Sequence, residues 1–582
     1  MENPELTPSP ADVPPTSESI SPPPTPRKDS TKLILGIGLG LILVAVIGLA
    51  ALLLPRLLNR PGSANPTAAA MPADTQFFVS FNPHFEALPN GDVVKKAWSD
   101  PALTQSIEDG IRSSLSDSNL DWDQDIAPWL GDELGLGVWK IPFNATSTGI
   151  SNQTPPAMVF ALATRDTAKS DAFLSKWRTN RESSGAKYDD DTYRGIKTVA
   201  QSDSNSAEAS AYASLNNLIV FATDLDDLHT AIDAALDNKG LAQSTRYQGT
   251  LTQLHGDRAL TAFFDFGPEL QQAVKQLPMI SGLGEAELSL LEAMQGIGLG
   301  VSFEPNGLRL EMVAAADADK LPIGQLGALN TPGNPNELLH SVPGTTFFYL
   351  SGQNLADGLQ SLLTGLGTAD PTIKSSIEDF ERQGGFELQR DLFGWMTDEF
   401  AIVGIPGPIG GSNQIPFGFG LLVKVTDQQL VERRSTNLFA ALAEQSGNKV
   451  QDLMVGNSQL HTIVDASGQP TLIYGLIGDK FVLASSQDLA KKIEDPGSAI
   501  LADDETFKSA TALLPSGNSG YFYFEPKQVV DLLSVGLAFS GQECTACDFF
   551  KPIKAIASTS EQPPTAANIS RAIMFVLLDT GQ

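Results

Sequence analysis

The longest uninterrupted apolar stretch of the chain runs from Leu33 to Leu54, where 22 residues carry no charged side chain. As a helix rising 1.5 Å per residue it reaches about 33 Å, enough to cross a bilayer core of roughly 30 Å. A cleaved signal peptide, with the small residues 68–70 as its cleavage site, is the alternative. Its apolar region would span only about 7–15 residues and lie closer to the N-terminus. We therefore predict an uncleaved transmembrane helix at residues 33–54.

The basic residues beside this helix predict its orientation. Arg27, Lys28 and Lys32 precede it, whereas Arg56 and Arg60 follow it. Because basic flanks are retained in the cytoplasm, the N-terminus is predicted to be cytoplasmic, with the large domain on the opposite side of the membrane. The sequence does not distinguish a plasma membrane from a thylakoid membrane.

The segments on either side of the helix have no pattern of a folded core. Residues 1–32 are rich in Pro, Ser, Thr and Glu. Such a composition buries too little apolar surface to offset the entropy of ordering, so we predict a disordered N-terminal tail. Residues 55–70 are predicted to be a linker.

Beyond residue 70 the pattern changes to short apolar runs separated by polar turns. Runs rich in Val, Phe, Tyr and Ile predict strands at 77–81, 158–163, 217–222, 262–266, 298–303 and 308–314. Helical periodicity with Asp or Ser near the start predicts helices at 168–178, 224–235 and 268–276. Turns such as 305–307 (Pro-Asn-Gly) favour antiparallel hairpins. The predicted fold class is α+β, a mostly antiparallel sheet with helices on one face.

This unit is predicted to occur twice. The matches between the copies are residues 72–80 with 343–351, 125–134 with 391–400, 151–155 with 412–416, Tyr212 and 220–222 with Tyr474 and 482–484, and 264–266 with 522–524. They follow the same order, and their spacing drifts slowly from 271 to 258 residues. We predict tandem copies at 71–329 and 337–582, joined by a Pro/Gly/Asn-rich stretch, with an insertion near 541–564 in the second copy.

The charge balance restricts the partners. The 582 residues include 38 Lys plus Arg and 68 Asp plus Glu, a net charge of −30. Residues 1–60 hold five acids and five bases, so the remaining 63 acids and 33 bases carry the whole excess. Nucleic acid is disfavoured, since a polyanion binds by releasing counterions to Lys and Arg. The predicted partner is the lipid bilayer, through residues 33–54; protein partners stay unidentified.

Three segments carry a resemblance to a known family. They are Pro-Ala-Asp-Thr-x-Phe-Phe at 72–78, Asp-Ile-x-x-Trp-Leu-Gly-Asp-Glu at 125–133 and Phe-Ala-Thr-Asp-Leu-Asp-Asp-Leu at 221–228. Following a single anchor and a Pro-rich tail, they resemble the cyanobacterial domain-of-unknown-function family numbered thirty-three fifty-two. The resemblance covers nearly everything after residue 70. It implies a cyanobacterial membrane setting and supplies no catalytic residues.

An acidic segment has the spacing of a calcium loop. Positions 1, 3, 5 and 12 are occupied by Asp121, Asp123, Asp125 and Asp132. Position 6, where such a loop needs glycine, is Ile126, and the second copy has Glu387 and Gln389 in place of the first two aspartates. We favour a solvated acidic turn over a calcium site and predict no metal ligands.

The segment Trp129–Leu134 recurs as Trp395–Phe400. One interpretation is a recognition patch. We favour two core tryptophans, each burying about 150–250 Å², with the neighbouring acidic side chains facing water.

Cys544 and Cys547 are the two cysteines of the chain and form a CxxC pair. Such a pair can exchange disulfides when a helix N-terminus lowers a thiol pKa. Here no tryptophan precedes it, and it lies in the predicted insertion rather than after a βαβ strand. A structural disulfide is the favoured interpretation, with free thiols and a catalytic pair as alternatives.

No catalytic motif emerges from the remaining sequence. The five histidines are scattered, and neither a phosphate-binding loop nor a nucleophile elbow is present. We predict no catalytic residues and no cofactor. Because the repeated matches are packing residues without a recurring polar cluster, the leading hypothesis is a non-catalytic interaction or assembly module. A carrier of lipid or another apolar ligand is the alternative, and an enzyme ranks third.

Overall fold

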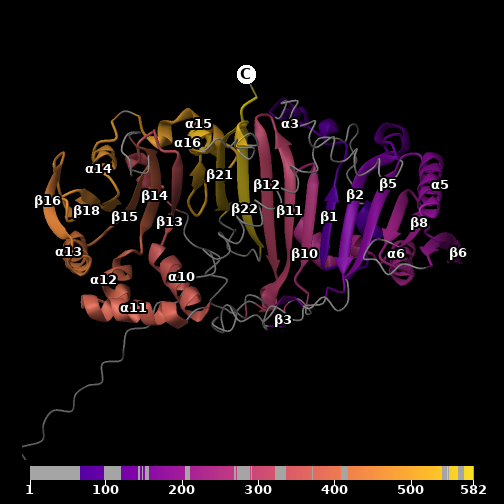
Figure 1. Cartoon of the computed structure of the whole chain (residues 1–582), viewed down its shortest axis with the longest axis horizontal. Helices are drawn as coiled ribbons and strands as arrows, with labels where there is room; N and C mark the ends of the chain where they lie inside the picture. Colours follow the sequence, from indigo (N-terminus) through magenta and orange to yellow (C-terminus); the bar gives the residue numbers. More distant parts are fainter. Residues whose placement is uncertain are drawn as a thin grey trace, which may run out of the picture.

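The computed structural model describes residues 66–97, 120–141, 156–202, 210–267, 292–320, 336–369, 371–407, 417–497, 499–539, 550–561 and 569–580, with isolated residues and short pairs between them (Figure 1). The predicted tail, the predicted helix at 33–54 and most of the predicted linker lie outside these ranges. Within them, no helix combines the length and the apolar character needed to cross a bilayer.

Twenty strands form one antiparallel sheet. From one edge to the middle the order is β6 (Tyr188–Tyr193), β7 (Ile196–Gln201), β8 (Ala211–Leu215), β9 (Leu218–Ala222), β5 (Ala157–Thr164), β2 (Leu130–Trp139), β1 (Phe77–Phe81), β10 (Leu260–Asp265), β11 (Met294–Glu304) and β12 (Gly307–Ala316). From the middle to the other edge follow β22 (Ile569–Leu578), β21 (Ile553–Glu561), β20 (Phe522–Phe524), β13 (Phe348–Gln353), β14 (Glu399–Pro406), β15 (Phe417–Lys424), β19 (Lys480–Ala484), β18 (Pro470–Ile477), β17 (Ser458–Val464) and β16 (Lys449–Val455). Strands β3 (Ala145–Thr146) and β4 (Gly149–Ile150) pair separately.

The strands on the two sides of the β12–β22 pair follow one chain order. Each half contributes ten strands, counted here in chain order without β3 and β4. From the outer edge to the middle, both halves have the order 4, 5, 6, 7, 3, 2, 1, 8, 9, 10. β6 and β16 thus form the two outer edges, and β12 and β22 meet in the middle (Figure 1). The predicted α+β class with a large antiparallel sheet is confirmed.

Helices cover both faces of the sheet. Because successive side chains of a strand point to opposite faces, we name the faces after Phe77 and Phe78 of β1. The Phe78 face packs against α2 (Pro66–Ala69), α6 (Leu225–Leu236), α7 (Thr245–Leu251), η7 (Glu337–Ser341), α14 (Gln487–Glu494) and α15 (Glu505–Thr511). The Phe77 face packs against η2 (Phe85–Ala87), α3 (Asp92–Ala97), α5 (Thr167–Ser183), α10 (Leu355–Ala369), α12 (Leu388–Asp391), η8 (Phe393–Trp395) and α13 (Gln428–Gln445).

The predicted placement of helices on one face is therefore wrong. On β9, for example, Val220 lies in the core beneath α6, whereas its neighbour Ile219 lies in the core beneath α5. Strands that are apolar at both alternating positions have two faces to bury, so one helical layer does not suffice.

Other elements complete the described structure. They are η3 (Trp122–Ile126), η4 (Leu241–Gln243), η6 (Ala318–Lys320), α11 (Pro371–Gly384), η9 (Leu501–Asp503) and α16 (Pro526–Phe539). The N-caps predicted from sequence are confirmed for α5 and α6, where Asp166 and Asp224 accept backbone N–H groups of Lys169 and Asp227. The helix predicted at 268–276 lies almost wholly outside the described residues.

Two predicted boundaries differ from the observed elements. Residues 66–70 of the predicted linker belong to the fold, since Ala68 and Ala70 are fully buried against the sheet. The predicted insertion at 541–564 overlaps β21, which occupies the position that β11 has in the other half. Ala68 and Ala70 are small, and β21 alternates between apolar and polar residues, so neither segment contains a long apolar run that marks it as part of the core.

The β12–β22 pair joins the two halves through reciprocal contacts. Glu311 lies directly opposite Ile573 in the register. An Nη of Arg309 on β12 donates to the carbonyl of Leu513 at 3.3 Å, and an Nη of Arg571 on β22 donates to the carbonyl of Gln253 at 2.8 Å. Each half thus contributes one arginine to the chain segment that follows a helix of the other half.

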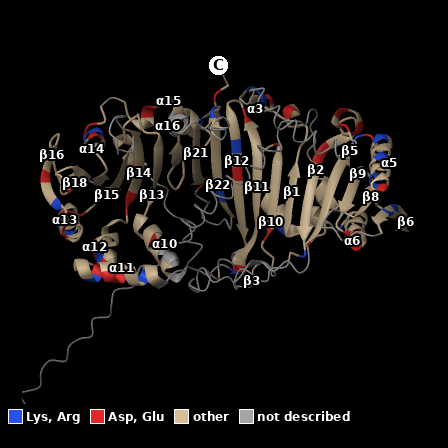
Figure 2. Ribbon diagram, in the orientation of Figure 1, with Lys and Arg blue, Asp and Glu red and all other residues tan. Residues whose placement is uncertain are grey.

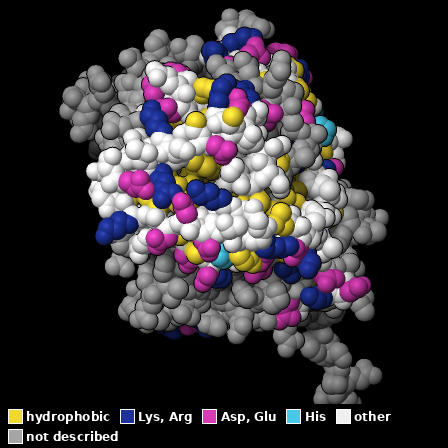
Figure 3. Space-filling model, turned by 90° about the vertical axis from the view of Figure 1, so that its right-hand side faces the viewer, with side chains coloured by type: hydrophobic (Ala, Val, Ile, Leu, Met, Phe, Trp, Pro, Cys, Tyr) yellow, Lys and Arg dark blue, Asp and Glu magenta, His cyan; other side chains and the backbone are white. Residues whose placement is uncertain are grey.

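Charged side chains lie mainly on the helices and outer strands (Figure 2). At the β6 end of the molecule, acidic and basic side chains are interspersed rather than gathered by sign (Figure 3). There Arg178 pairs with Asp190 at 2.6 Å and Arg194 with Asp233 at 2.7 Å. β12 is an exception near the middle, because Arg309 and Glu311 both lie on its Phe78 face.

Candidate functional site

A buried glutamate occupies the same place in each half of the sheet. Glu133 on β2 is 7% exposed, and its Oε2 accepts a hydrogen bond from the backbone N–H of Thr67 at 3.2 Å. Thr67 lies in the first turn of α2, where N–H groups have no partner within the helix. Burial raises the pKa of Glu133 to about 7, despite the hydrogen bonds that favour its charged form.

Glu399 on β14 repeats this arrangement. It is fully buried, and its two carboxylate oxygens accept the backbone N–H groups of Glu337 and Leu338 at 3.0 and 3.2 Å. Burial raises its pKa as well. These N–H groups open η7, the counterpart of α2. The prediction that both acidic residues of each segment face water is therefore wrong for the glutamates, because orphan N–H groups inside the core need an acceptor.

One signal in the sequence could have found this contact. On β2, glycines alternate on the Phe78 face at positions 135 and 137. A Cβ at Gly135 would lie 2.2 Å from the Thr67 hydroxyl oxygen, so only glycine lets α2 approach this closely. A strand with glycines at alternate positions marks a backbone packed against it.

The two recurring tryptophans are core residues. Trp129 and Trp395 are 1% and 7% exposed. Each indole N–H donates to a backbone carbonyl four residues earlier, that of Asp125 at 2.6 Å and that of Asp391 at 3.0 Å. A recognition patch would need exposed rings, so the core interpretation is the one that fits.

Two of the carboxylates considered as calcium ligands accept backbone hydrogen bonds within their own turn. Asp121 accepts the N–H of Gln124 at 2.9 Å, and Asp125 accepts the N–H of Asp121 at 2.8 Å. Asp125 also pairs with Lys176 of α5 at 2.6 Å. In the described part of the chain, no three His, Cys, Asp or Glu side chains are grouped for a metal ion. The acidic-turn interpretation accounts for these contacts.

Of the two cysteines, Cys547 is buried and Cys544 lies outside the described residues, so their disulfide stays a prediction. Three of the five histidines have separate environments in the described structure. His84 is buried with Nε2 at 3.2 Å from the Leu130 carbonyl, His229 stacks on Tyr193, and His461 contacts Asp452 at 3.0 Å.

The feature that best fits a binding role is the Phe77 face in the middle of the sheet. Along β1 the side chains of this face, Phe77, Val79 and Phe81, are only half-buried, whereas the alternating ones are buried. In the other half the half-buried positions are again aromatic, Phe522 and Phe524 of β20. Strand positions of an antiparallel sheet that are open to solvent normally carry polar side chains.

Two aromatic rings on this face are open to solvent. Phe160 of β5 is 40% exposed and Phe419 of β15 is 44% exposed. Phe419 lies at the rim of an aromatic group in which the rings of Phe347 and Phe417 are 4.9 Å apart. Between the helices that cover parts of it, the Phe77 face thus presents partly exposed apolar side chains in both halves, and we take these strand positions as the candidate functional site. Its chemistry suits apolar contact rather than proton transfer or metal binding.

The fold defines an α+β protein organised around one continuous antiparallel sheet. The chain belongs to the family described as protein of unknown function (DUF3352), whose model matches residues 34–578. No curated protein matches the chain.

Among solved structures, crystal forms III and I of TP0453 are similar to part of the chain. They have 8% and 7% identity and TM-scores of 0.24 and 0.23, and each alignment covers 46% of this chain. The same alignments cover 86% and 85% of the two TP0453 chains. At these TM-scores the matches do not establish a shared fold.

Proposed function

We propose that the protein is a non-catalytic interaction or assembly module, held at a membrane by residues 33–54. One observation carries the proposal: two pairs of polar side chains that recur between the halves, in the described part of the chain, are engaged by the backbone of their own fold. Thr75 and Thr346 bind the carbonyls of Pro72 and Pro343 at 2.7 Å, as Glu133 and Glu399 bind helix N–H groups. Because these recurring polar groups stabilise the fold, they support a role in interaction or assembly rather than in catalysis.

The proposal includes a tandem duplication of one α+β unit. Three observations support it: the common strand order, the paired contacts of the threonines and glutamates, and the reciprocal arginine contacts across β12 and β22. Arg309 and Arg571 hold corresponding places in β12 and β22, and so do the carbonyls that they bind. Such a self-complementary contact is typical of a two-fold interface.

Cross-linking in native membranes tests the assembly role. We expect cross-links to partner proteins or to a second copy, and we expect them to be reduced by the double substitution Phe160→Ser/Phe419→Ser. Leu236→Ser is the matched control, since Leu236 is 38% exposed but lies on α6, which covers the opposite face. Recovery of only an isolated monomer from native membranes would count against the proposal.

A carrier of lipid or another apolar molecule is the second candidate. The exposed rings of Phe160 and Phe419 favour it, since each offers an apolar contact to an acyl chain in its own half of the sheet. Mass spectrometry of the purified protein decides between the two. A copurifying lipid that is lost in the Phe160→Ser/Phe419→Ser variant supports the carrier, and a preparation free of apolar ligand excludes it.

Membrane anchoring and orientation are parts of the same proposal. The 22-residue apolar stretch and the basic residues before it support an N-terminus in the cytoplasm, and the family resemblance implies a cyanobacterial membrane. Alkaline carbonate extraction of the full chain, beside a variant lacking residues 33–54, tests the anchor. Release of the full chain by carbonate would overturn it.

A further inference from the structure

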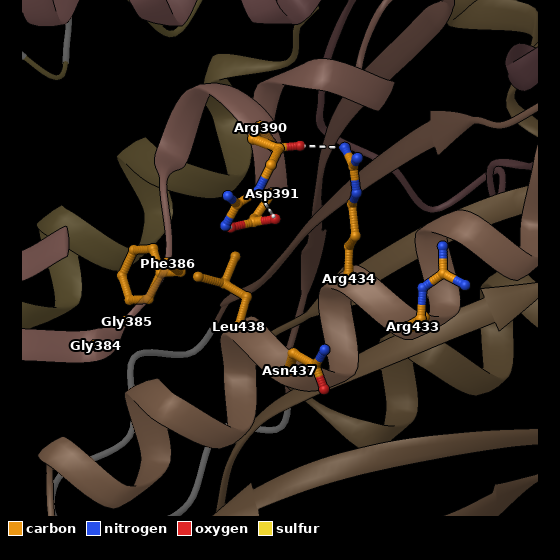
Figure 4. A pocket seen from close by; sticks show the side chains of 9 residues that line it. All are labelled: Gly384, Gly385, Phe386, Arg390, Asp391, Arg433, Arg434, Asn437 and Leu438. Carbon is orange, nitrogen blue, oxygen red and sulfur yellow. Dashed lines mark hydrogen bonds and ion pairs between the residues drawn. The ribbon is translucent and has the colours of Figure 1, made fainter. Parts of the chain in front are cut away.

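A pocket of about 410 Å³ lies where the end of α11, the helix α12 and the helix α13 meet (Figure 4). Phe386 and Leu438 line it with apolar side chains that are themselves buried, at 6% and 3% exposure. Three arginines also line it: Arg390 from α12, and Arg433 and Arg434 from successive positions of α13. The pocket therefore combines a mainly polar lining that includes guanidinium groups with two apolar side chains.

Arg433 and Arg434 form no ion pair within the described structure, although Arg434 helps to lower the pKa of Asp391, which also lines the pocket. Arg390 pairs with Asp391 at 2.6 Å and with Glu387 at 3.5 Å. Arg434 donates to the carbonyl oxygen of Arg390, a neutral acceptor (Figure 4). Among the described residues, no carboxylate is paired with Arg433 or Arg434. In a chain of net charge −30, this is an unusual local excess of positive charge.

The other half shows that the fold does not require these arginines. The helix α5 corresponds to α13, with Asp166 capping the one as Asp427 caps the other. Counting from these caps, Ala172 and Phe173 take the places of Arg433 and Arg434. Phe173 is buried, with its ring 5.1 Å from that of Trp129.

The aspartate at the pocket is also handled differently in the two halves. Asp125 corresponds to Asp391, and both accept the backbone N–H of the residue four positions earlier. In the first half, however, Lys176 of α5 pairs with Asp125 at 2.6 Å and occupies the position of Asn437. Replacement of that lysine by a neutral amide, together with the added arginines, leaves α13 with donors directed at a pocket.

We propose that this pocket binds a small organic anion in which a carboxylate or phosphate is joined to an apolar body. The planar guanidinium fork matches both oxyanions through paired N–H donors, so Arg433 and Arg434 hold the charged end. Phe386 and Leu438 contact the apolar body. The volume falls within the range of roughly 300–1,000 Å³ that is usual for small-molecule sites. A soluble metabolite and an anionic lipid headgroup share this chemistry.

Titration calorimetry on the full chain in detergent tests the proposal with phenyl phosphate as probe. We expect saturable binding that weakens with salt, weaker binding of inorganic phosphate and none of phenol. The double substitution Arg433→Ala/Arg434→Ala should weaken phenyl phosphate binding roughly tenfold or more. Arg382→Ala is the matched control, because Arg382 is an exposed α11 arginine paired with Asp379 and does not line the pocket.

A second variant and a vesicle assay complete the test. Arg434→Lys keeps the charge but loses the fork, so we expect intermediate affinity with an unchanged melting temperature. Phosphatidylglycerol vesicles that displace phenyl phosphate from the protein would assign a lipid headgroup; phenyl phosphate binding that these vesicles do not reduce would assign a soluble anion. Equal binding by the double variant and the unmodified protein, or no binding of phenyl phosphate, would overturn the proposal.

Discussion

Glu133 shows how strongly one residue depends on its surroundings. In the sequence it is one of many acids beside a turn, yet the fold buries it on β2 against the start of α2. Its folded-state pKa of about 7, against an ordinary value near 4.5, means that the folded protein binds a proton more tightly than the unfolded chain. The contribution of Glu133 to the free energy of unfolding is therefore largest at low pH. It falls as the pH rises from about 4.5 to about 7.

The substitution Glu133→Gln tests this pH dependence. Glutamine keeps an oxygen acceptor for the Thr67 N–H but cannot ionise, so the variant should lose less stability between pH 4.5 and 7.5 than the unmodified protein. A difference of up to about 3 kcal/mol corresponds to the shift of pKa. Urea unfolding at both pH values measures it, and parallel pH profiles would contradict the assignment.

The cysteines give a second prediction at the scale of residues. If Cys544 and Cys547 form a structural disulfide, the unfolded protein should react with no thiol reagent before reduction and with two equivalents afterwards. Mass spectrometry after alkylation in denaturant, with and without reductant, counts the thiols. Full alkylation without reductant would reject the disulfide.

At the scale of elements, the strands and helices follow from local pattern. β1 was predicted at the residues where it forms, and the turn at 305–307 joins β11 and β12 as an antiparallel hairpin. β12 was predicted as a strand too, and it carries two charged side chains, those of Arg309 and Glu311. In the fold the two side chains pair at 2.6 Å beside the β12–β22 pair. Glu311 also accepts the N–H of His255 at 2.6 Å.

The substitution Arg309→Met tests how much this ion pair contributes to the free energy of unfolding. It leaves Glu311 buried without its countercharge, at a cost of about 3 kcal/mol in the free energy of unfolding. The double variant Arg309→Met/Glu311→Gln should recover part of the loss, because glutamine still accepts the His255 N–H and carries no charge. Urea unfolding compares the three proteins; a double variant no more stable than the single one would contradict the explanation.

At the scale of the whole molecule, the two halves share one sheet. The sequence repeat predicted two copies, but the repeat does not state how copies pack, and separate domains on a linker would produce the same matches. The register of β12 with β22 joins them, with Leu310 opposite Met574. Burial of these strand edges against each other removes two unpaired rows of N–H and carbonyl groups from solvent.

Engineered cysteines test this join. In a background with Cys544 and Cys547 replaced by serine, Leu310→Cys/Met574→Cys should form a disulfide within one chain, because the two residues face each other on the Phe77 face. Leu310→Cys/Phe575→Cys is the control, since its side chains point to opposite faces. Non-reducing electrophoresis detects the bond by faster migration. Cross-linking solely between chains would show that the halves do not pair in this way.

The sequence alone determined the features that depend on neighbouring residues: the strand at 77–81, the caps at Asp166 and Asp224, and the turn before β12. These are set by backbone preferences and side-chain contacts a few positions apart. Only the tertiary structure decided that Glu133 is buried, that Arg433 and Arg434 line a pocket together with Phe386, and that β12 pairs with β22. Each of these joins residues tens to hundreds of positions apart, and such contacts are selected by the packing of the whole chain, which no local pattern encodes.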